Sequence, residues 1–172
     1  MKRTKALFLD RDGVLNKAII KKKKPYSPRM ISQVVLSNEL KKILNQAKKN
    51  YFLIGITNQP DVGDKIISKQ KGIKINNKVK KYYQLDELYC CYHVRDANCI
   101  CRKPKIGLAL KAKKKYKINL KKSFVIGDRW SDMEFGKKLN CKTIYIDYKY
   151  KDKKPKYFNY KINKPEEIRK YV

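Results

Sequence analysis

Short apolar runs alternate with longer amphipathic stretches from one end of the chain to the other. The short runs predict strands at residues 6–9, 51–56, 88–92, 123–126, 142–146 and 159–162. Stretches in which apolar residues recur every three or four positions predict helices at 37–49, 68–83, 105–116, 132–139 and 165–171. Strands that alternate with helices are typical of an α/β fold. We therefore expect a doubly wound, Rossmann-like parallel sheet with helices on both faces.

The predicted helices differ in how clearly the sequence marks them. The first has a suitable N-cap in Ser37 and a well-formed apolar face, made of Leu40, Ile43, Leu44 and Ala47. The helix at 68–83 has a thinner apolar face that Gly72 interrupts, which weakens the prediction.

The chain has 172 residues, enough for one domain with a sizeable core, so residues 1–172 are predicted to be a single domain. No connection between predicted elements is long enough for a large cap domain. The apolar runs are too short to cross a bilayer, and the first one stops at Asp10, too early for a signal peptide. The expectation is a cytoplasmic monomer without a membrane partner.

The formal net charge is +30, which makes a polyanionic partner worth weighing. The lysines are spread through every segment, and the only low-complexity patch is the run of four at 21–24. We therefore expect no specific nucleic-acid partner, while anionic small substrates would be attracted. A basic nucleic-acid-binding protein, or a phosphatase that acts on polynucleotide ends, stays open as an alternative of another class.

Polar residues follow three of the predicted strands. Asp10 and Asp12 follow the first, Thr57, Asn58 and Gln59 the second, and Asp128 and Asp132 the strand at 123–126. Ligands of open parallel sheets bind outside the carboxyl ends of the strands, so these side chains should meet in one crevice. Carboxylates gathered there need a hard cation such as Mg²⁺ to offset their repulsion.

The same residues carry a resemblance to the haloacid dehalogenase-like (HAD) phosphatases. The stretch "FLDRDGVLN" resembles the first motif of that family, "IGITNQ" the second, "CRKPK" the third and "VIGDRWSD" the fourth, all in the expected order. The resemblance implies a phosphatase that works through an aspartyl-phosphate. Asp10 would be the nucleophile and Asp12 the general acid and base, while Thr57 and Lys103 would hold the phosphoryl oxygens.

The resemblance also implies a magnesium site. Its ligands would be the carboxylates of Asp10 and Asp128 and the backbone carbonyl of Asp12. Asp132 would position Lys103 or the waters of the metal, although an ordinary carboxylate in the first turn of a helix explains it equally well.

Four of the five cysteines lie close together, beside the only histidine of the chain. Three thiolates and one imidazole complete a tetrahedral zinc set, for which the sequence offers Cys91, His93, Cys99 and Cys101. Spacing alone would also allow Cys90 in place of Cys91. A zinc-containing subgroup of HAD phosphatases carries C-x-H and C-x-C followed by RKP. This resemblance selects Cys91 and implies a structural zinc in a loop at 90–103.

The subgroup includes heptose bisphosphate phosphatases and the phosphatase domain of histidine biosynthesis. The resemblance therefore implies a phosphorylated sugar as substrate, with histidinol phosphate as the alternative. Asn58 and Arg102 are expected to bind it. The heptose enzymes usually have an arginine where this chain has Asp64, so we expect Arg29 or Lys65 to compensate.

Overall fold

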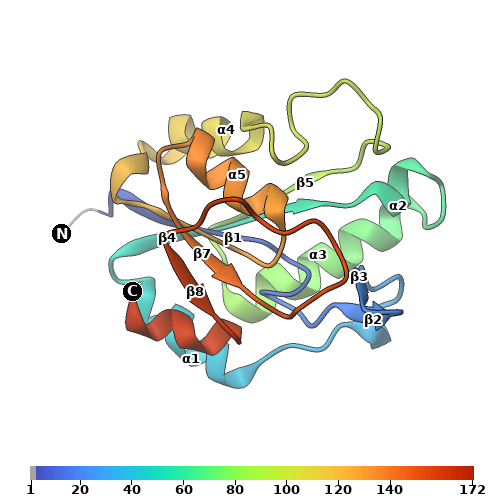
Figure 1. Ribbon diagram of the computed structural model, residues 1–172, viewed down its shortest axis with the longest axis horizontal. Helices are drawn as coiled ribbons and strands as arrows, with labels where there is room; N and C mark the ends of the chain where they lie inside the picture. The colour runs from blue at the N-terminus through green and yellow to red at the C-terminus, as the bar shows by residue number, and fades with distance from the viewer. Residues whose placement is uncertain (1–2) are drawn as a thin grey trace.

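The computed structural model describes residues 3–172, and its centre is a six-stranded sheet (Figure 1). Every neighbouring pair of strands in this sheet is parallel. From edge to edge the order is β5 (Glu87–Cys91), β4 (Tyr51–Asn58), β1 (Lys5–Leu9), β6 (Phe124–Gly127), β7 (Lys142–Ile146) and β8 (Tyr160–Ile162). The predicted parallel α/β fold is confirmed.

Helices cover both faces of the sheet, as predicted. One face carries α1 (Asn38–Ala47), α3 (Lys69–Tyr83) and the 3-10 helix η3 (Pro165–Lys170), and the other carries α4 (Gly107–Tyr116) and α5 (Trp130–Lys138) (Figure 1). Side chains of β1 alternate between the two cores, because successive residues of a strand point to opposite faces. Leu7 and Leu9 enter the core under α1 and α3, whereas Ala6 and Phe8 enter the core under α4 and α5.

Two features of the predicted helices, the N-cap of α1 and the glycine in α3, can be checked in the structure. The Ser37 hydroxyl accepts a hydrogen bond from the backbone N–H of Leu40, which makes Ser37 the predicted N-cap of α1. Gly72 is buried in α3, and a Cβ there would lie 3.0 Å from Val62 and 3.4 Å from Tyr92. The glycine that weakened the helix prediction is thus a site of close packing against Val62, in the segment after β4, and Tyr92, after β5.

Several short elements were not predicted, chief among them the hairpin of β2 (Ile19–Lys21) and β3 (Lys24–Tyr26). Its two turn residues, Lys22 and Lys23, have φ values of 49° and 60°. Two successive positive φ angles give a type I′ turn, which usually carries Asn-Gly. A run of lysines gives no such signal. The other short elements are η1 (Ile31–Gln33), α2 (Pro60–Gly63) and η2 (Leu120–Lys122).

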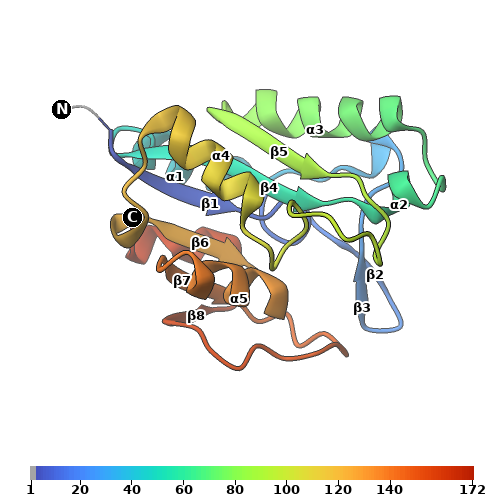
Figure 2. The same cartoon turned by 90° about the horizontal axis from the view of Figure 1, so that it is seen from above.

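The predicted terminal helix is corrected to the 3-10 helix η3. Residues 3–172 contain no large cap domain, as predicted, since the connection between β1 and α1 holds only the β2–β3 hairpin and η1. In Figure 2 the arrowheads of β1, β4 and β5 point toward the side that carries α2, this hairpin and the loop after β5. Across residues 3–172, none of the helices combines the length and the apolar character needed to span a membrane.

Candidate active site and metal centres

A cavity of about 440 Å³ opens at the carboxyl ends of the central strands. The residues that line it include all but one of the predicted catalytic, magnesium-binding and substrate-binding side chains: Asp10, Asp12, Thr57, Asn58, Arg102, Lys103 and Asp128. Asp132 also lines it. Arg29 does not: its Nε lies 2.8 Å from Oδ2 of Asp61, and only Asp61 reaches the cavity.

The Lys103 ammonium is buried at the floor of the cavity, where it is 5% exposed. Its Nζ lies 2.8 Å from Oδ1 of Asp10 and 2.6 Å from Oδ1 of Asp132, and it donates to the Ile56 carbonyl at 2.7 Å. Burial alone would lower the pKa of Lys103, but the two carboxylates raise it well above its ordinary value. Lys103 therefore carries a fixed positive charge beside Asp10.

The side chain of Asn58 holds the backbone on which Lys103 sits. Its Oδ1 accepts from the Lys103 N–H at 3.0 Å, and its Nδ2 donates to the Lys103 carbonyl at 3.1 Å. Both polar atoms of Asn58 are thus used within the protein. Asp132 contributes in a similar way, since its Oδ2 accepts from the backbone N–H of Arg129 while its Oδ1 meets Lys103.

Asp10, Asp128 and Asp132 bring carboxylate oxygens within 4.8 Å of one another, close enough to share a cation. Asp128 is 3% exposed; the Tyr150 hydroxyl lies beside its carboxylate, but neither oxygen has a hydrogen-bond partner of good geometry in residues 3–172. Its carboxylate packs over Gly13, where φ is +91° and a Cβ would overlap that carboxylate. Buried oxygens without a well-aligned donor are what a hard cation would satisfy, so this donor set fits Mg²⁺.

Burial and mutual repulsion raise the pKa values of the carboxylates in this cluster. Burial raises the pKa of Asp10 to about 6, Lys103 opposes that rise, and Asp132 and Asp12 add to it. Burial, together with Asp10 and Asp132, also raises the pKa of Asp128 well above its ordinary value.

The Asp10 pKa predicts a pH dependence of stability. An acid whose pKa is higher in the folded state binds its proton more tightly there. The contribution of Asp10 to the free energy of unfolding therefore falls as the pH rises from 3.8 to about 6. Without added magnesium, wild-type protein should lose stability relative to Asp10→Asn across this window, by up to about 3 kcal/mol. Urea titrations of both proteins from pH 4 to pH 7 measure the difference. A constant difference would contradict the raised pKa.

The Asp12 carboxylate is separate from this cluster and is surrounded by donors. Its Oδ1 accepts from Arg11 Nε and Asn16 Nδ2, each at 3.0 Å. Its Oδ2 accepts from Arg11 Nη2 at 2.9 Å, from the Ser27 hydroxyl at 2.7 Å and from Gln59 Nε2 at 2.7 Å. Burial raises the pKa of Asp12, but Arg11 and the other donors outweigh it and leave that pKa below its ordinary value.

Arg11 and Ser27 were not predicted as site residues, and Gln59 was expected in the crevice but without a role. Gln59 Nε2 also donates to Oγ1 of Thr57 at 2.8 Å, so it connects two predicted catalytic side chains. For Arg11 the sequence did contain a signal, since an arginine between two acids directly after a buried strand is placed to neutralise one of them. Ser27 gave none, because only the path of the hairpin brings it to Asp12.

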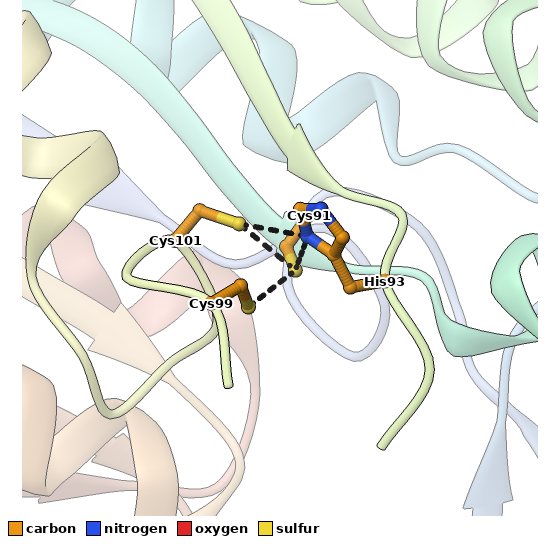
Figure 3. Close-up of side chains that lie close together, drawn as sticks. All are labelled: Cys91, His93, Cys99 and Cys101. Atoms are coloured by element: carbon orange, nitrogen blue, oxygen red, sulfur yellow. Dashed lines mark hydrogen bonds between the residues drawn. The ribbon is translucent and has the colours of Figure 1, made fainter. Parts of the chain in front are cut away.

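The four predicted zinc ligands lie together at the end of β5 and in the loop that follows it (Figure 3). Cys91 Sγ lies 3.5 Å from His93 Nδ1, 3.8 Å from Cys99 Sγ and 3.2 Å from Cys101 Sγ, and His93 Nδ1 lies 3.1 Å from Cys101 Sγ. A zinc tetrahedron has edges of about 3.8 Å between sulfurs and about 3.5 Å between sulfur and nitrogen. The set therefore fits zinc with no open ligand position.

Cys90 lies outside this cluster. It precedes Cys91 in the same strand, so its side chain points to the opposite face of the sheet. Burial raises the pKa of Cys90 to about 12, which keeps it an uncharged thiol. The choice of Cys91 over Cys90 agrees with this geometry. Cys141, the fifth cysteine, is buried in the core under α4 and α5.

Comparisons with known proteins point to one kind of enzyme. A family model described as HAD-hydrolase-like matches residues 100–157. A D-glycero-beta-D-manno-heptose-1,7-bisphosphate 7-phosphatase of Helicobacter pylori is 34% identical over 151 residues, which cover 83% of this chain and 82% of that protein. The corresponding alpha-anomer phosphatase of Campylobacter jejuni is 33% identical over 150 residues, covering 84% and 83%.

A second group of relatives has another name. The bifunctional histidine biosynthesis protein HisB of Buchnera aphidicola is 32% identical over 165 residues, which cover 86% of this chain but 42% of that protein. Among solved structures, a D,D-heptose 1,7-bisphosphate phosphatase from B. bronchiseptica, complexed with magnesium and phosphate, has a TM-score of 0.80. It covers 97% of both chains at 18% identity, so it supports the fold.

Proposed function

Since the chain belongs to the HAD-like phosphatases, in the family of the heptose 1,7-bisphosphate 7-phosphatases, we propose that it hydrolyses the 7-phosphate of D-glycero-D-manno-heptose 1,7-bisphosphate. The observation that carries the proposal is the buried cluster of Asp10, Asp128, Asp132 and Lys103 at the floor of the cavity. It offers a nucleophile, a fixed cation and a donor set that fits a metal within one cavity.

The first step is attack of an Asp10 carboxylate oxygen on phosphorus. The bond between phosphorus and the sugar oxygen breaks, and Asp12 gives its proton to the leaving alkoxide. The products of this step are the free sugar hydroxyl and an aspartyl-phosphate on Asp10. The resting Asp12 is ionised, but a phosphate dianion in the cavity opposes the field of Arg11 and favours protonation of Asp12.

The second step hydrolyses the aspartyl-phosphate. A water attacks phosphorus and gives its proton to Asp12, while the bond between phosphorus and the Asp10 oxygen breaks. Inorganic phosphate leaves, and Asp10 returns as a carboxylate. Lys103 and the Thr57 hydroxyl stabilise the phosphoryl oxygens in both steps. The donors around Asp12 favour its ionised form, which suits the base role in this step.

Mg²⁺ would be held by the carboxylates of Asp10 and Asp128 and the backbone carbonyl of Asp12. When bound, it supplies positive charge that lets a carboxylate and a phosphate approach each other. Asp132 is better suited to position Lys103 than to bind metal, because its oxygens already accept from Lys103 and from the Arg129 backbone. Zinc would be held by Cys91, His93, Cys99 and Cys101 as a structural ion, since the protein fills all four positions.

The rest of the cavity is suited to a second anionic group on the substrate. Lys24, Arg95 and Arg102 line it, so cations from the β2–β3 hairpin and the zinc loop accompany Lys103. The compensation expected from Arg29 is not supported, because Arg29 pairs with Asp61 outside the cavity lining. In the proposal, the cations of the zinc loop and of the hairpin compensate instead of Arg29.

A substrate panel at fixed Mg²⁺ tests this function. We expect the highest kcat/KM for heptose 1,7-bisphosphate, at least about tenfold above heptose 7-phosphate, because the 1-phosphate adds a charged hydrogen-bonding group. Histidinol phosphate belongs in the panel because of the HisB similarity. Preference for histidinol phosphate would replace the proposed substrate, and equal turnover of every phosphate ester would contradict specificity for the bisphosphate.

A further inference from the structure

We propose that Arg11 and Asn76 are positioning residues that orient Asp12 for proton transfer to the leaving group. They act as a chain of hydrogen bonds that starts at the partly buried Tyr92, which lies between the zinc-site residues Cys91 and His93 in the sequence. The inference rests on the proposed function, because it concerns the acid in the first step of that reaction.

Arg11 grips Asp12 with a planar fork. Its Nε donates to Oδ1 at 3.0 Å and its Nη2 to Oδ2 at 2.9 Å, which fixes both the position and the plane of the carboxylate. The arginine is 1% exposed, so water can neither replace these bonds nor screen the charge. A lysine in this place would keep the charge and lose the fork.

The third nitrogen of Arg11 is anchored in turn. Its Nη1 donates to Oδ1 of Asn76 at 2.7 Å, and Asn76 Nδ2 donates to the Tyr92 hydroxyl at 2.9 Å. Asn76 belongs to α3 and is 5% exposed. The guanidinium thus has a partner on each nitrogen, and a helix and the zinc loop determine where its fork points.

A second connection joins the same loop to the same carboxylate. The backbone N–H of Gln59 donates to the Cys91 carbonyl at 2.8 Å, and its Nε2 donates to Oδ2 of Asp12. This backbone bond continues the β4–β5 ladder, in which Asn58 pairs with Cys91, so the sheet itself holds Gln59 beside Asp12. Through Tyr92, the zinc loop that presents Lys103 to the phosphate also orients Asp12.

The choice of leaving group can show whether a variant has lost the orientation of Asp12 or only the stability of the fold. A sugar alkoxide needs a proton as it leaves, whereas nitrophenolate is a stable anion and leaves without one. The value of kcat/KM reports steps only up to departure of the leaving group. A defect confined to proton donation by Asp12 should therefore lower kcat/KM for heptose 1,7-bisphosphate much more than for p-nitrophenyl phosphate.

The experiment compares Arg11→Lys and Tyr92→Phe with wild type on these two substrates. For Arg11→Lys we expect about a 100-fold loss on the bisphosphate and a change within about threefold on the nitrophenyl ester. Tyr92→Phe removes only the anchoring hydroxyl, and about a fivefold loss on the bisphosphate is expected. The matched control is Tyr82→Phe, whose hydroxyl donates to Asn38 at the surface and should matter for neither substrate.

The outcomes are distinct. Equal losses on both substrates in Tyr92→Phe, or an unchanged ratio in folded Arg11→Lys, would overturn the positioning role and leave the phosphatase proposal intact. A wild-type protein that hydrolyses neither substrate would contradict the proposed function itself. The zinc content of each variant should equal that of wild type, which separates lost orientation from a lost loop.

Discussion

Asp10→Asn is expected to lower kcat by at least about 10⁴-fold on every phosphate ester, because the amide cannot form the aspartyl-phosphate. The fold should survive, since the change removes one of several crowded carboxylates and leaves Lys103 paired with Asp132. Steady-state kinetics together with thermal unfolding of the same sample tests both statements.

The matched control for that experiment is Asp96→Asn, an exposed acid in the zinc loop that lies outside the cavity lining. It should keep wild-type kcat. Quenching wild-type turnover with acid should trap phosphate on the protein, and Asp10→Asn should trap none. Substantial turnover by Asp10→Asn would contradict the assignment of Asp10 as the nucleophile.

Cys101→Ser is expected to release zinc and disorganise the loop between β5 and Lys103. Wild-type protein should contain about one zinc per chain, and the variant close to none. Structural zinc sites supply on the order of 10 kcal/mol in small zinc-finger peptides, so the free energy of unfolding should fall markedly. Activity should fall with it, because Lys103 follows Cys101 by two residues and Asn58 holds it through its backbone.

Cys90→Ser is the matched control, because it makes the same change in a neighbouring thiol outside the ligand set. It should keep its zinc and most of its activity, with a modest loss of stability from placing a hydroxyl in a half-buried site. Metal analysis and urea unfolding of both variants measure the contrast. A wild-type protein that is fully folded and active without zinc would contradict the second metal centre.

The fold was largely predictable because its signals are local. Runs of apolar residues mark the strands, and the N-cap and apolar face of α1 mark its start and its buried side. The β2–β3 hairpin escaped prediction because its turn takes two positive φ angles at Lys22 and Lys23, where the usual turn residues are absent. The terminal segment looked helical, but it forms only the 3-10 helix η3.

The residues of the candidate site were predictable where a sequence motif specifies the residue type and a strand end fixes its position in the fold. Asp10, Thr57, Lys103 and Asp128 do line one cavity. Arg29 was misplaced, because the sequence could not show that Asp61 would pair with it away from the cavity lining. The catalytic and metal-binding roles, the single domain, the monomeric state and the cytoplasmic location remain predictions.

Local patterns in the chain are enough to predict the strands, the acids at their ends and the zinc-ligand set, because each is marked by residues close together in the sequence. How these parts act on one another depends on contacts between distant segments. Arg11 donates a hydrogen bond to Asn76, which is 65 positions away in the sequence, and Lys103 pairs with Asp10 at the floor of the cavity. Neither contact can be read from one segment of the sequence alone. Burial of these charges forces each to find a partner, and a partner distant in sequence becomes a neighbour only when the chain folds.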